Sequence, residues 1–246
     1  MNEELWDVDL VVGREPSTGV RVTPEELAEW ASGAGIRGGI LGSLRAVHFN
    51  ASSGNDEARR VAEGLRHVIP GLVPAVTLET RDWLGTRAIL RQTPPGSVVR
   101  LAPERQDCQP THPGFRAIIA ECVEREMVIL CEGDLRRWGP ALAGRGAVVV
   151  FLDAHFYHLG DLVALFSEEP GFHTSTRLLN GPDSLEIVRD ELGVERLVFG
   201  SRAGLHEGAS ALARLRTSTL SPADRAAVAA GNLRRLLGVD QEADLS

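Results

Sequence analysis

Arginines follow several short apolar runs of the sequence, at points where a buried strand is expected to end. Arg202 follows Leu197–Phe199 and a Gly-Ser turn, and Arg100 and Arg177 lie at the ends of two further runs. A guanidinium stays charged at any relevant pH and offers a planar set of donors that matches a carboxylate. Arginines facing the mouth of a parallel barrel would therefore bind a small acidic molecule.

Arg202 has two interpretations at this stage. It either faces the other strand ends and pairs with carboxylates there, or it points aside and pairs with Glu207 at the rim. His48 and His158 also follow apolar stretches, and we include them as substrate-binding candidates, although each also suits a packing or rim position.

The apolar runs alternate with segments of helical periodicity along the chain. Strands are expected at Leu5–Val12, Ile36–Leu44 or Ala46–Phe49, Leu72–Thr77, Val98–Leu101, Met127–Cys131, Ala147–Leu152, Phe172–Thr176 and Leu197–Phe199. Helices are expected after the Thr23-Pro24 start signal and at Ser53–Val68, Thr80–Arg91, Pro113–Arg125, Leu135–Leu142, Leu159–Phe166, Ser184–Leu192, Ala209–Leu215 and Pro222–Leu237. Eight such pairs predict an α/β fold with one (β/α)₈ TIM-like barrel over residues 1–239, followed by a polar C-terminal tail over 240–246. A doubly wound sheet is the alternative, but no glycine-rich phosphate loop follows the first strand.

The order of several segments resembles the amidohydrolase-related family, which comprises metal-dependent TIM-barrel hydrolases and decarboxylases. The last strand of that family reads F-G-S-D, where this chain has Phe199-Gly200-Ser201-Arg202, and its closing helix reads G-N-x-x-R-L-L, as Gly231–Leu237 does here. The resemblance extends to Trp6–Val11, Val99–Pro103, Leu152–His155 and Thr174–Arg177.

The resemblance implies a set of site residues that departs from the family pattern. Asp9 and Val11 stand where the first strand of the family carries its two metal-binding histidines. Glu132 lies at the end of the fifth strand, His155 matches the histidine of the sixth, and Arg202 replaces the metal-binding aspartate. Because valine cannot coordinate and a guanidinium repels cations, we expect a metal-free centre in which His155 or Glu132 serves as general base.

Three functions remain open from the sequence. The favoured one is an amidohydrolase-fold enzyme that acts on an anionic small molecule by hydrolysis or related acid/base chemistry, with no cofactor. The second is a hydrolase or decarboxylase that binds zinc or another divalent metal through Asp9, Glu132 and His155. The third is a barrel that has kept the fold as a non-catalytic binding or scaffold protein.

The amino-acid composition disfavours several classes of binding partner. The chain has 246 residues and a formal net charge of -8, which disfavours nucleic acid and anionic membranes as partners. All 26 basic residues are arginines, so lysine Schiff-base chemistry is excluded. Three cysteines without paired spacing, and a first segment without the pattern of a signal peptide, predict a cytoplasmic protein. Formation of a homo-oligomer stays open.

Overall fold

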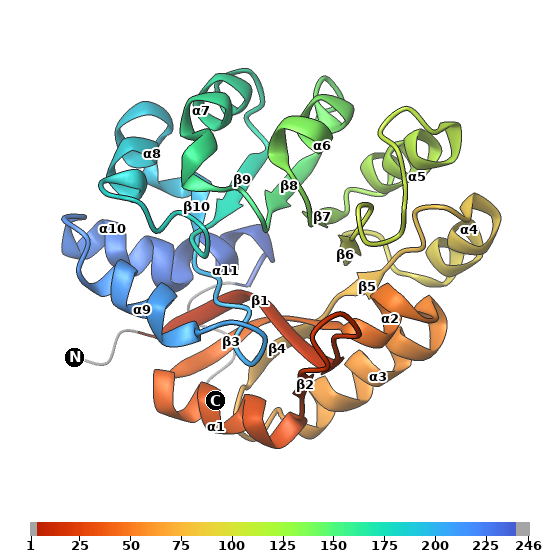
Figure 1. Cartoon of the computed structure of the whole chain (residues 1–246), viewed down its shortest axis with the longest axis horizontal. Helices are drawn as coiled ribbons and strands as arrows, with labels where there is room; N and C mark the ends of the chain where they lie inside the picture. Colours follow the sequence, from red (N-terminus) through yellow and green to blue (C-terminus); the bar gives the residue numbers. More distant parts are fainter. Residues whose placement is uncertain (1–3, 240–246) are drawn as a thin grey trace.

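The computed structural model describes residues 4–239 and contains two sheets with helices packed around them (Figure 1). The first sheet has the order β2-β1-β3-β4, in which only β2 is antiparallel to its neighbour. The second has the order β10-β9-β8-β7-β6-β5 and is parallel throughout. The strands are β1 (Leu5–Arg14), β2 (Arg21–Val22), β3 (Ile36–Ser43), β4 (Gly71–Pro74), β5 (Val76–Thr77), β6 (Val98–Leu101), β7 (Val128–Cys131), β8 (Val148–Phe151), β9 (Phe172–Ser175) and β10 (Leu197–Val198).

Backbone hydrogen bonds join the two sheets on both sides. Where β4 passes into β5, the amide of Ala75 donates to the carbonyl of Leu41 on β3 (2.9 Å). On the opposite side, the amide of Val8 on β1 donates to the carbonyl of Phe199, directly after β10 (2.9 Å). The strands thus follow one another around a ring in chain order, and the predicted TIM-like α/β fold is confirmed.

Most helices lie around the outside of this ring (Figure 1), whereas Ala230 and Leu233 of the last helical segment pack against an apolar cluster inside it. The helices are α1 (Pro24–Ala34), α2 (Leu44–His48), α3 (Ala51–Gly64), α4 (Trp83–Gln92), α5 (Pro113–Glu124), α6 (Leu135–Leu142), α7 (Leu159–Glu168), α8 (Ser184–Leu192), α9 (Gly208–Arg216), α10 (Pro222–Ala226) and α11 (Asn232–Leu236). The predicted start of α1 is confirmed: the Thr23 hydroxyl accepts from the Glu26 amide, and the Glu26 carboxylate accepts from the Thr23 amide.

The structure decides one alternative that the sequence left open, and two expected segments differ from the prediction. The strand of the second unit is Ile36–Ser43, whereas most of Ala46–Phe49 belongs to α2. The expected strand Leu72–Thr77 is interrupted at Ala75, and the expected last helix contains a π-helical turn over Ala227–Gly231. The carbonyl of Val228 in that turn accepts the Phe199 amide (3.0 Å), so the irregular turn packs against the end of β10. The predicted tail over 240–246 lies outside the described residues, and the domain boundary stays a prediction.

One cluster of buried apolar side chains takes members from most strands of the ring, as the inner face of a barrel requires. Val98, Leu130, Val150 and Val198 belong to it, and so does Trp6. The Trp6 ring fills the space beside Gly38 and Gly71, where an added Cβ would lie only 2.4–2.6 Å from the ring. The apolar cluster therefore fills the interior beneath the strand ends.

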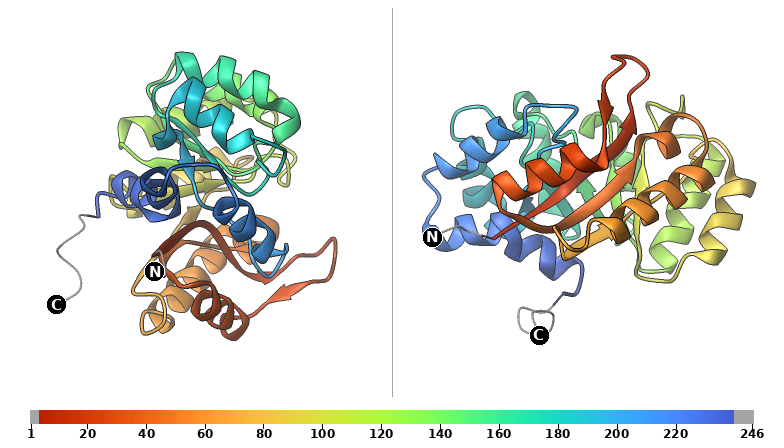
Figure 2. Two further views of the ribbon diagram at one scale, coloured as in Figure 1. Left: turned by 90° about the vertical axis from the view of Figure 1, so that its left-hand side faces the viewer. Right: turned by 90° about the horizontal axis from the view of Figure 1, so that it is seen from below.

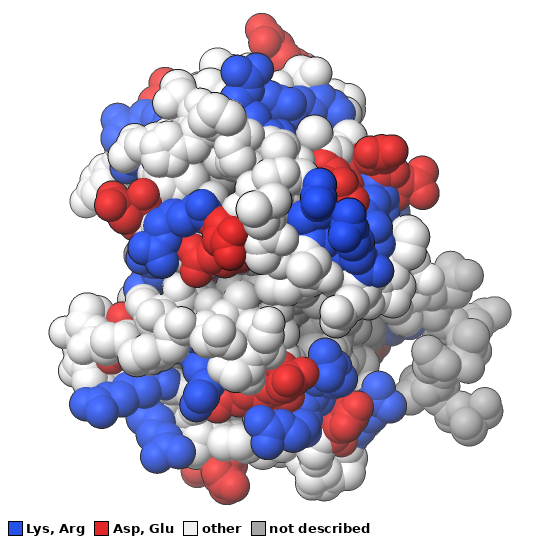
Figure 3. Space-filling view, turned by 90° about the vertical axis from the view of Figure 1, so that its right-hand side faces the viewer, with Lys and Arg blue, Asp and Glu red and all other residues white. Residues whose placement is uncertain are grey.

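The outer surface has few distinctive features. The β1–β2 hairpin projects beyond the rest of the molecule (Figure 2). On the face shown in Figure 3, acidic and basic side chains are interspersed without a large area of one sign. Within the described part of the chain, every helix is too short or too polar to traverse a lipid bilayer.

Candidate active site

The candidate site begins where the inner apolar cluster ends. Side chains two residues apart on a strand share a face, so Arg100 follows Val98, and Glu132 follows Leu130, on the inner side of the barrel. Asp9 reaches the same centre from β1, whose pairing with β3 is irregular between Asp7 and Leu10. The three side chains are at least 95% buried, so each charge needs a partner.

Arg100 bridges the two carboxylates. Its Nε donates to Oε1 of Glu132 (2.6 Å) and its Nη2 donates to Oδ1 of Asp9 (2.9 Å). Gly42 on β3 leaves the space for this guanidinium, because a Cβ at Gly42 would lie 2.8 Å from Arg100 Nη1. A glycine on one strand thus allows a buried arginine on another.

Arg202 completes the centre from the turn after β10. Its φ of 50° is in the left-handed region, which is uncommon for a residue other than glycine and directs the side chain inward. The guanidinium donates from Nε to Oδ2 of Asp9 (2.8 Å) and lies 3.6 Å from Glu132 Oε2 and 3.4 Å from Asp153 Oδ1. The expected pairing with Asp9 and Glu132 is therefore present, and Arg202 is 3% exposed rather than at the rim.

Arg177 and Asp153 form the outer part of the same cluster. Arg177 Nη2 donates to Asp153 Oδ1 and to the carbonyl of Leu152, and its Nε lies 3.6 Å from Asp9 Oδ2. The second oxygen of Asp153 accepts the amide of Gly133 (2.9 Å). Three guanidiniums and three carboxylates therefore meet in one charge-balanced group, which we call the arginine centre (Asp9, Arg100, Glu132, Asp153, Arg177 and Arg202).

The arginine centre keeps its inner carboxylates ionised. Burial alone would raise the pKa of Asp9, but Arg202, Arg100 and Arg177 together lower it below its ordinary value. Burial likewise opposes ionisation of Glu132, whereas Arg100, Arg202 and Arg105 hold its pKa well below the usual range. Both groups are consequently poor proton acceptors at neutral pH.

Arg105 connects the arginine centre to the β1–β2 hairpin. Its Nε donates to Glu132 Oε2 (3.1 Å) and its Nη1 donates to Oε2 of Glu15 in the hairpin loop (2.8 Å). The same oxygen of Glu15 lies 3.2 Å from His48 Nε2. Among the described residues, Glu15 and Arg105 thus link His48 to the arginine centre.

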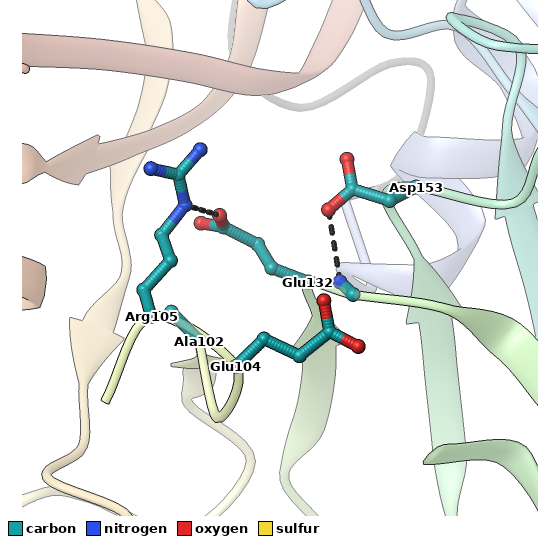
Figure 4. Close-up of a pocket in the computed structure, with 6 residues that line it drawn as sticks. Ala102, Glu104, Arg105, Glu132 and Asp153 are labelled. Carbon is teal, nitrogen blue, oxygen red and sulfur yellow. Dashed lines mark hydrogen bonds and ion pairs between the residues drawn. The ribbon is translucent and has the colours of Figure 1, made fainter. Parts of the chain in front are cut away.

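A cavity of about 270 Å³ opens beside the arginine centre (Figure 4). Its lining comes from the segments that follow β6, β7 and β8, and comprises Ala102, Glu104, Arg105, Glu132, Gly133 and Asp153. The cavity thus lies at the carboxyl ends of adjacent strands, where barrel enzymes carry their sites.

Asp7 forms a separate buried polar pair below the centre. Its carboxylate accepts from the backbone amides of Asp9 (2.9 Å) and Ser201 (3.1 Å) and from the Ser201 hydroxyl. Burial raises the pKa of Asp7 to about 6, although the hydrogen bonds from Ser201 and Asp9 oppose the rise.

The histidines near the mouth lie outside the arginine centre. His155 caps the short helix at Phe156–His158: its Nδ1 accepts the Tyr157 amide (3.3 Å) and its ring stacks on Tyr157 at 4.4 Å. The pKa of His155 is lowered by burial and then by the charges of His158 and Arg177. His206 is affected more directly by the arginine centre. Burial lowers its pKa, and the guanidiniums of Arg177 and Arg202 lower it further.

Comparison with solved structures identifies the fold. A TIM-barrel protein from Bordetella bronchiseptica matches with a TM-score of 0.73 and 14% identity, over 96% of this chain and 99% of that one. A 2-pyrone-4,6-dicarboxylic acid hydrolase from Pseudomonas putida matches at 0.69 and 19% identity, over 98% and 100%. The chain has the fold of the amidohydrolase-related TIM barrels. The resemblance expected from the sequence is thereby confirmed at the level of the fold. Comparison with protein-family models and with curated sequences gives no match.

One of these barrels, a dihydroxybenzoic acid decarboxylase from Polaromonas, was crystallised with bound manganese (TM-score 0.66, 13% identity, covering 96% of this chain and 97% of that one). The arginine centre of this chain does not fit a divalent cation. Both oxygens of Asp9 and both of Glu132 face guanidiniums, and Arg202 lies between them. Within residues 4–239, no group of three His, Cys, Asp or Glu side chains that could hold a metal is found, and a metal site built from Asp9, Glu132 and His155 stays a prediction.

The structure brings together five of the predicted site residues and separates the other three. Asp9, Arg100, Glu132, Arg177 and Arg202 form the arginine centre. His155, His48 and His158 lie at its margin or on the rim. Sequence reasoning missed Asp153 and Arg105, although both follow predicted strands and the same strand-end rule applies to them. It also missed Glu15 and His206, which lie in loops without a recognisable pattern.

Proposed function

We propose that this chain is a metal-independent enzyme of the amidohydrolase fold that acts on a small organic acid at the barrel mouth. The observation that carries the proposal is the buried Nη2 of Arg202, which has no hydrogen-bond partner within the described residues. It belongs to a guanidinium that lies between Glu132 and Asp153, and both of these carboxylates line the cavity. An unsatisfied buried donor costs free energy, which an acceptor entering between the two carboxylates would recover.

The arginines would have different roles in binding the ligand. Arg105 lines the cavity with its side chain 34% exposed, so it is the guanidinium most accessible to a ligand carboxylate. Arg100 and Arg177 hold Asp9, Glu132 and Asp153 in place and supply positive charge behind the cavity wall. The names of similar barrels support an acid as ligand, since they include a 2-pyrone-4,6-dicarboxylic acid hydrolase and a 2,6-dihydroxybenzoate decarboxylase.

Proton transfer would fall to an imidazole. The low pKa of Glu132 makes it a poor base at neutral pH. In His155, the bond that Nδ1 accepts from Tyr157 favours the neutral ring with its proton on Nε2, which is then a donor. His206 lies next to the arginine centre, since its backbone amide donates to the carbonyl of Arg202 (3.1 Å), and its lowered pKa keeps the ring neutral at pH 7. We therefore assign it the role of base in hydrolysis or related acid/base chemistry, with His155 as a hydrogen-bond donor.

One observation favours a second candidate, a non-catalytic binding barrel: arginines engage every carboxylate of the arginine centre. A centre built only to hold charge would bind an acid without transforming it. The two candidates predict the same ligand and differ in turnover.

Calorimetric titration with acetate, malonate, succinate and citrate tests the shared part of the proposal. Arg105→Gln should weaken the best of these acids at least tenfold, and EDTA should leave binding unchanged. Arg136→Gln is the matched control, because Arg136 pairs with Asp134 and is not part of the cavity lining. Equal affinities in both variants, or no binding of any acid, would overturn the proposal. If a bound acid is converted, His206→Ala should abolish turnover while retaining binding; binding without turnover selects the second candidate.

A further inference from the structure

The carboxylates that line the cavity differ in whether an arginine pairs with them. Glu132 and Asp153 are neutralised from behind by Arg100, Arg177 and Arg202. Arg105 is shared between Glu132 and Glu15. Glu104 is the exception, because within residues 4–239 no arginine or histidine pairs with its carboxylate. The cavity wall therefore carries one carboxylate without a cationic partner.

Glu104 is an exposed residue, but one of its carboxylate oxygens is anchored to the cavity wall. Its Oε1 accepts from the indole Nε1 of Trp138 (2.9 Å) and from the backbone amide of Asp134 (3.1 Å). Trp138 is fully buried, and the Glu104 carboxyl carbon packs against Gly133, where an added Cβ would lie 2.9 Å from it. Oε2 makes no hydrogen bond within the described residues, so it remains an acceptor for a group inside the cavity (Figure 4).

The cavity thus presents an unpaired acceptor together with cationic donors. Oε2 of Glu104 is the acceptor. The donors are Arg202 Nη2, which has no hydrogen-bond partner within the described residues, and the partly exposed guanidinium of Arg105, which also pairs with Glu132 and Glu15. A ligand with carboxylates alone would bring negative charge against Glu104, whereas a ligand with one carboxylate and one ammonium group would meet a partner at each end.

We infer that the cavity recognises an amino-acid-like zwitterion, whose ammonium group binds Glu104 and whose carboxylate faces Arg105 and Arg202. This inference rests on the proposed acid binding and adds the second recognition group. A volume of about 270 Å³ suits such a molecule, since cavities that enclose drug-sized ligands begin at roughly 300 Å³.

The test uses probes that share one carbon skeleton: 2-, 3- and 4-aminobutanoate, butanoate and butylamine, titrated calorimetrically at pH 7. At least one aminobutanoate should bind the wild-type protein ten times more tightly than butanoate or butylamine. Glu104→Gln retains an acceptor for Trp138 and should reduce that aminobutanoate to the affinity of butanoate, without weakening butanoate. Glu168→Gln, on the exposed end of α7, is the charge-matched control and should change nothing.

The outcomes separate this inference from the proposed function. Butanoate binding without preference for any aminobutanoate, or a preference that survives Glu104→Gln, would overturn the zwitterion while leaving acid binding intact. Failure of butanoate and all three aminobutanoates to bind the wild-type protein would overturn both.

Discussion

Asp7 and Asp9 lie two residues apart on β1, and both side chains are fully buried, yet their surroundings differ. Asp7 has only hydrogen-bond donors from Ser201 and the backbone, and its pKa is raised to about 6. Asp9 faces three guanidiniums, and its pKa is lowered. Neutral donors only partly offset desolvation, whereas full charges overcome it.

Neutralising Asp9 should have the largest effect. Asp9→Asn leaves Arg100, Arg177 and Arg202 facing one carboxylate fewer in a buried site, so we expect the free energy of unfolding at pH 7 to fall by roughly 3–5 kcal/mol. Asp7→Asn should lower the free energy of unfolding by about 1 kcal/mol at most, or raise it. Urea denaturation of the two variants measures both losses. Equal losses would show that the surroundings of Asp7 and Asp9 do not differ in their effect on stability.

Removal of Arg202 should cause the second-largest loss in the free energy of unfolding. Arg202→Met leaves Asp9 paired with Arg100 and Arg177 but strips Glu132 and Asp153 of a shared partner, which should cost roughly 3 kcal/mol. Arg136→Met on the surface should cost less than about 0.5 kcal/mol. If the two variants unfold alike in urea, Arg202 is not a stabilising part of the arginine centre.

The two aspartates should also oppose each other in their pH dependence. The folded protein binds the Asp7 proton up to about pH 6, while the unfolded chain releases it near pH 4, so this stability is fully present below pH 4 and lost as pH rises through 6. The loss should reach at most about 3 kcal/mol. Asp9, with its lowered pKa, contributes stability that is present above pH 4 and lost in more acidic solution.

Comparing Asp7→Asn with the wild-type protein by urea denaturation between pH 4 and pH 7 isolates the first effect. The variant should become progressively more stable relative to the wild-type protein over this interval. A constant difference across the range would show that Asp7 titrates as it does in the unfolded chain.

Filling the space beside Arg100 should have a smaller effect. The Cβ of Gly42→Ala would lie 2.8 Å from Arg100 Nη1 and 3.2 Å from its Cδ, in a guanidinium already fixed by two carboxylates. We expect a loss of about 1–2 kcal/mol in urea denaturation. Gly64→Ala, where nothing lies within 4 Å of the added Cβ, is the matched control and should be neutral or slightly stabilising.

Added metal should have the smallest effect. Zinc or manganese should shift the midpoint of thermal unfolding by less than about 1 °C, because the arginine centre offers a cation no free carboxylate pair. Elemental analysis after purification without chelator tests the same point. Near-stoichiometric zinc that is lost in His155→Ala would contradict the metal-free centre and favour the metal-dependent alternative.

The sequence predicted the barrel well because strand-like runs and helical periodicity alternate regularly, and the helix start at Thr23 was confirmed. Local composition left two candidates for the second strand, and the structure selects Ile36–Ser43, because Ala46–His48 belong to a helix that starts at the Ser43 cap. The strand-end rule found the arginines of the centre. It could not find Glu15, whose place depends on the β1–β2 hairpin, or assign the His155 ring to a stack on Tyr157, since both depend on loop conformation.

The hydrogen bond between Trp138 and Glu104 gives the protein an optical reporter. The indole is in the core, but its Nε1 touches the carboxylate whose other oxygen is available to the cavity. A charge that enters the cavity and pairs with Glu104 changes the electric field along the excited-state dipole of that ring. Its fluorescence emission should therefore shift when a charged ligand occupies the cavity, which would report binding without a label.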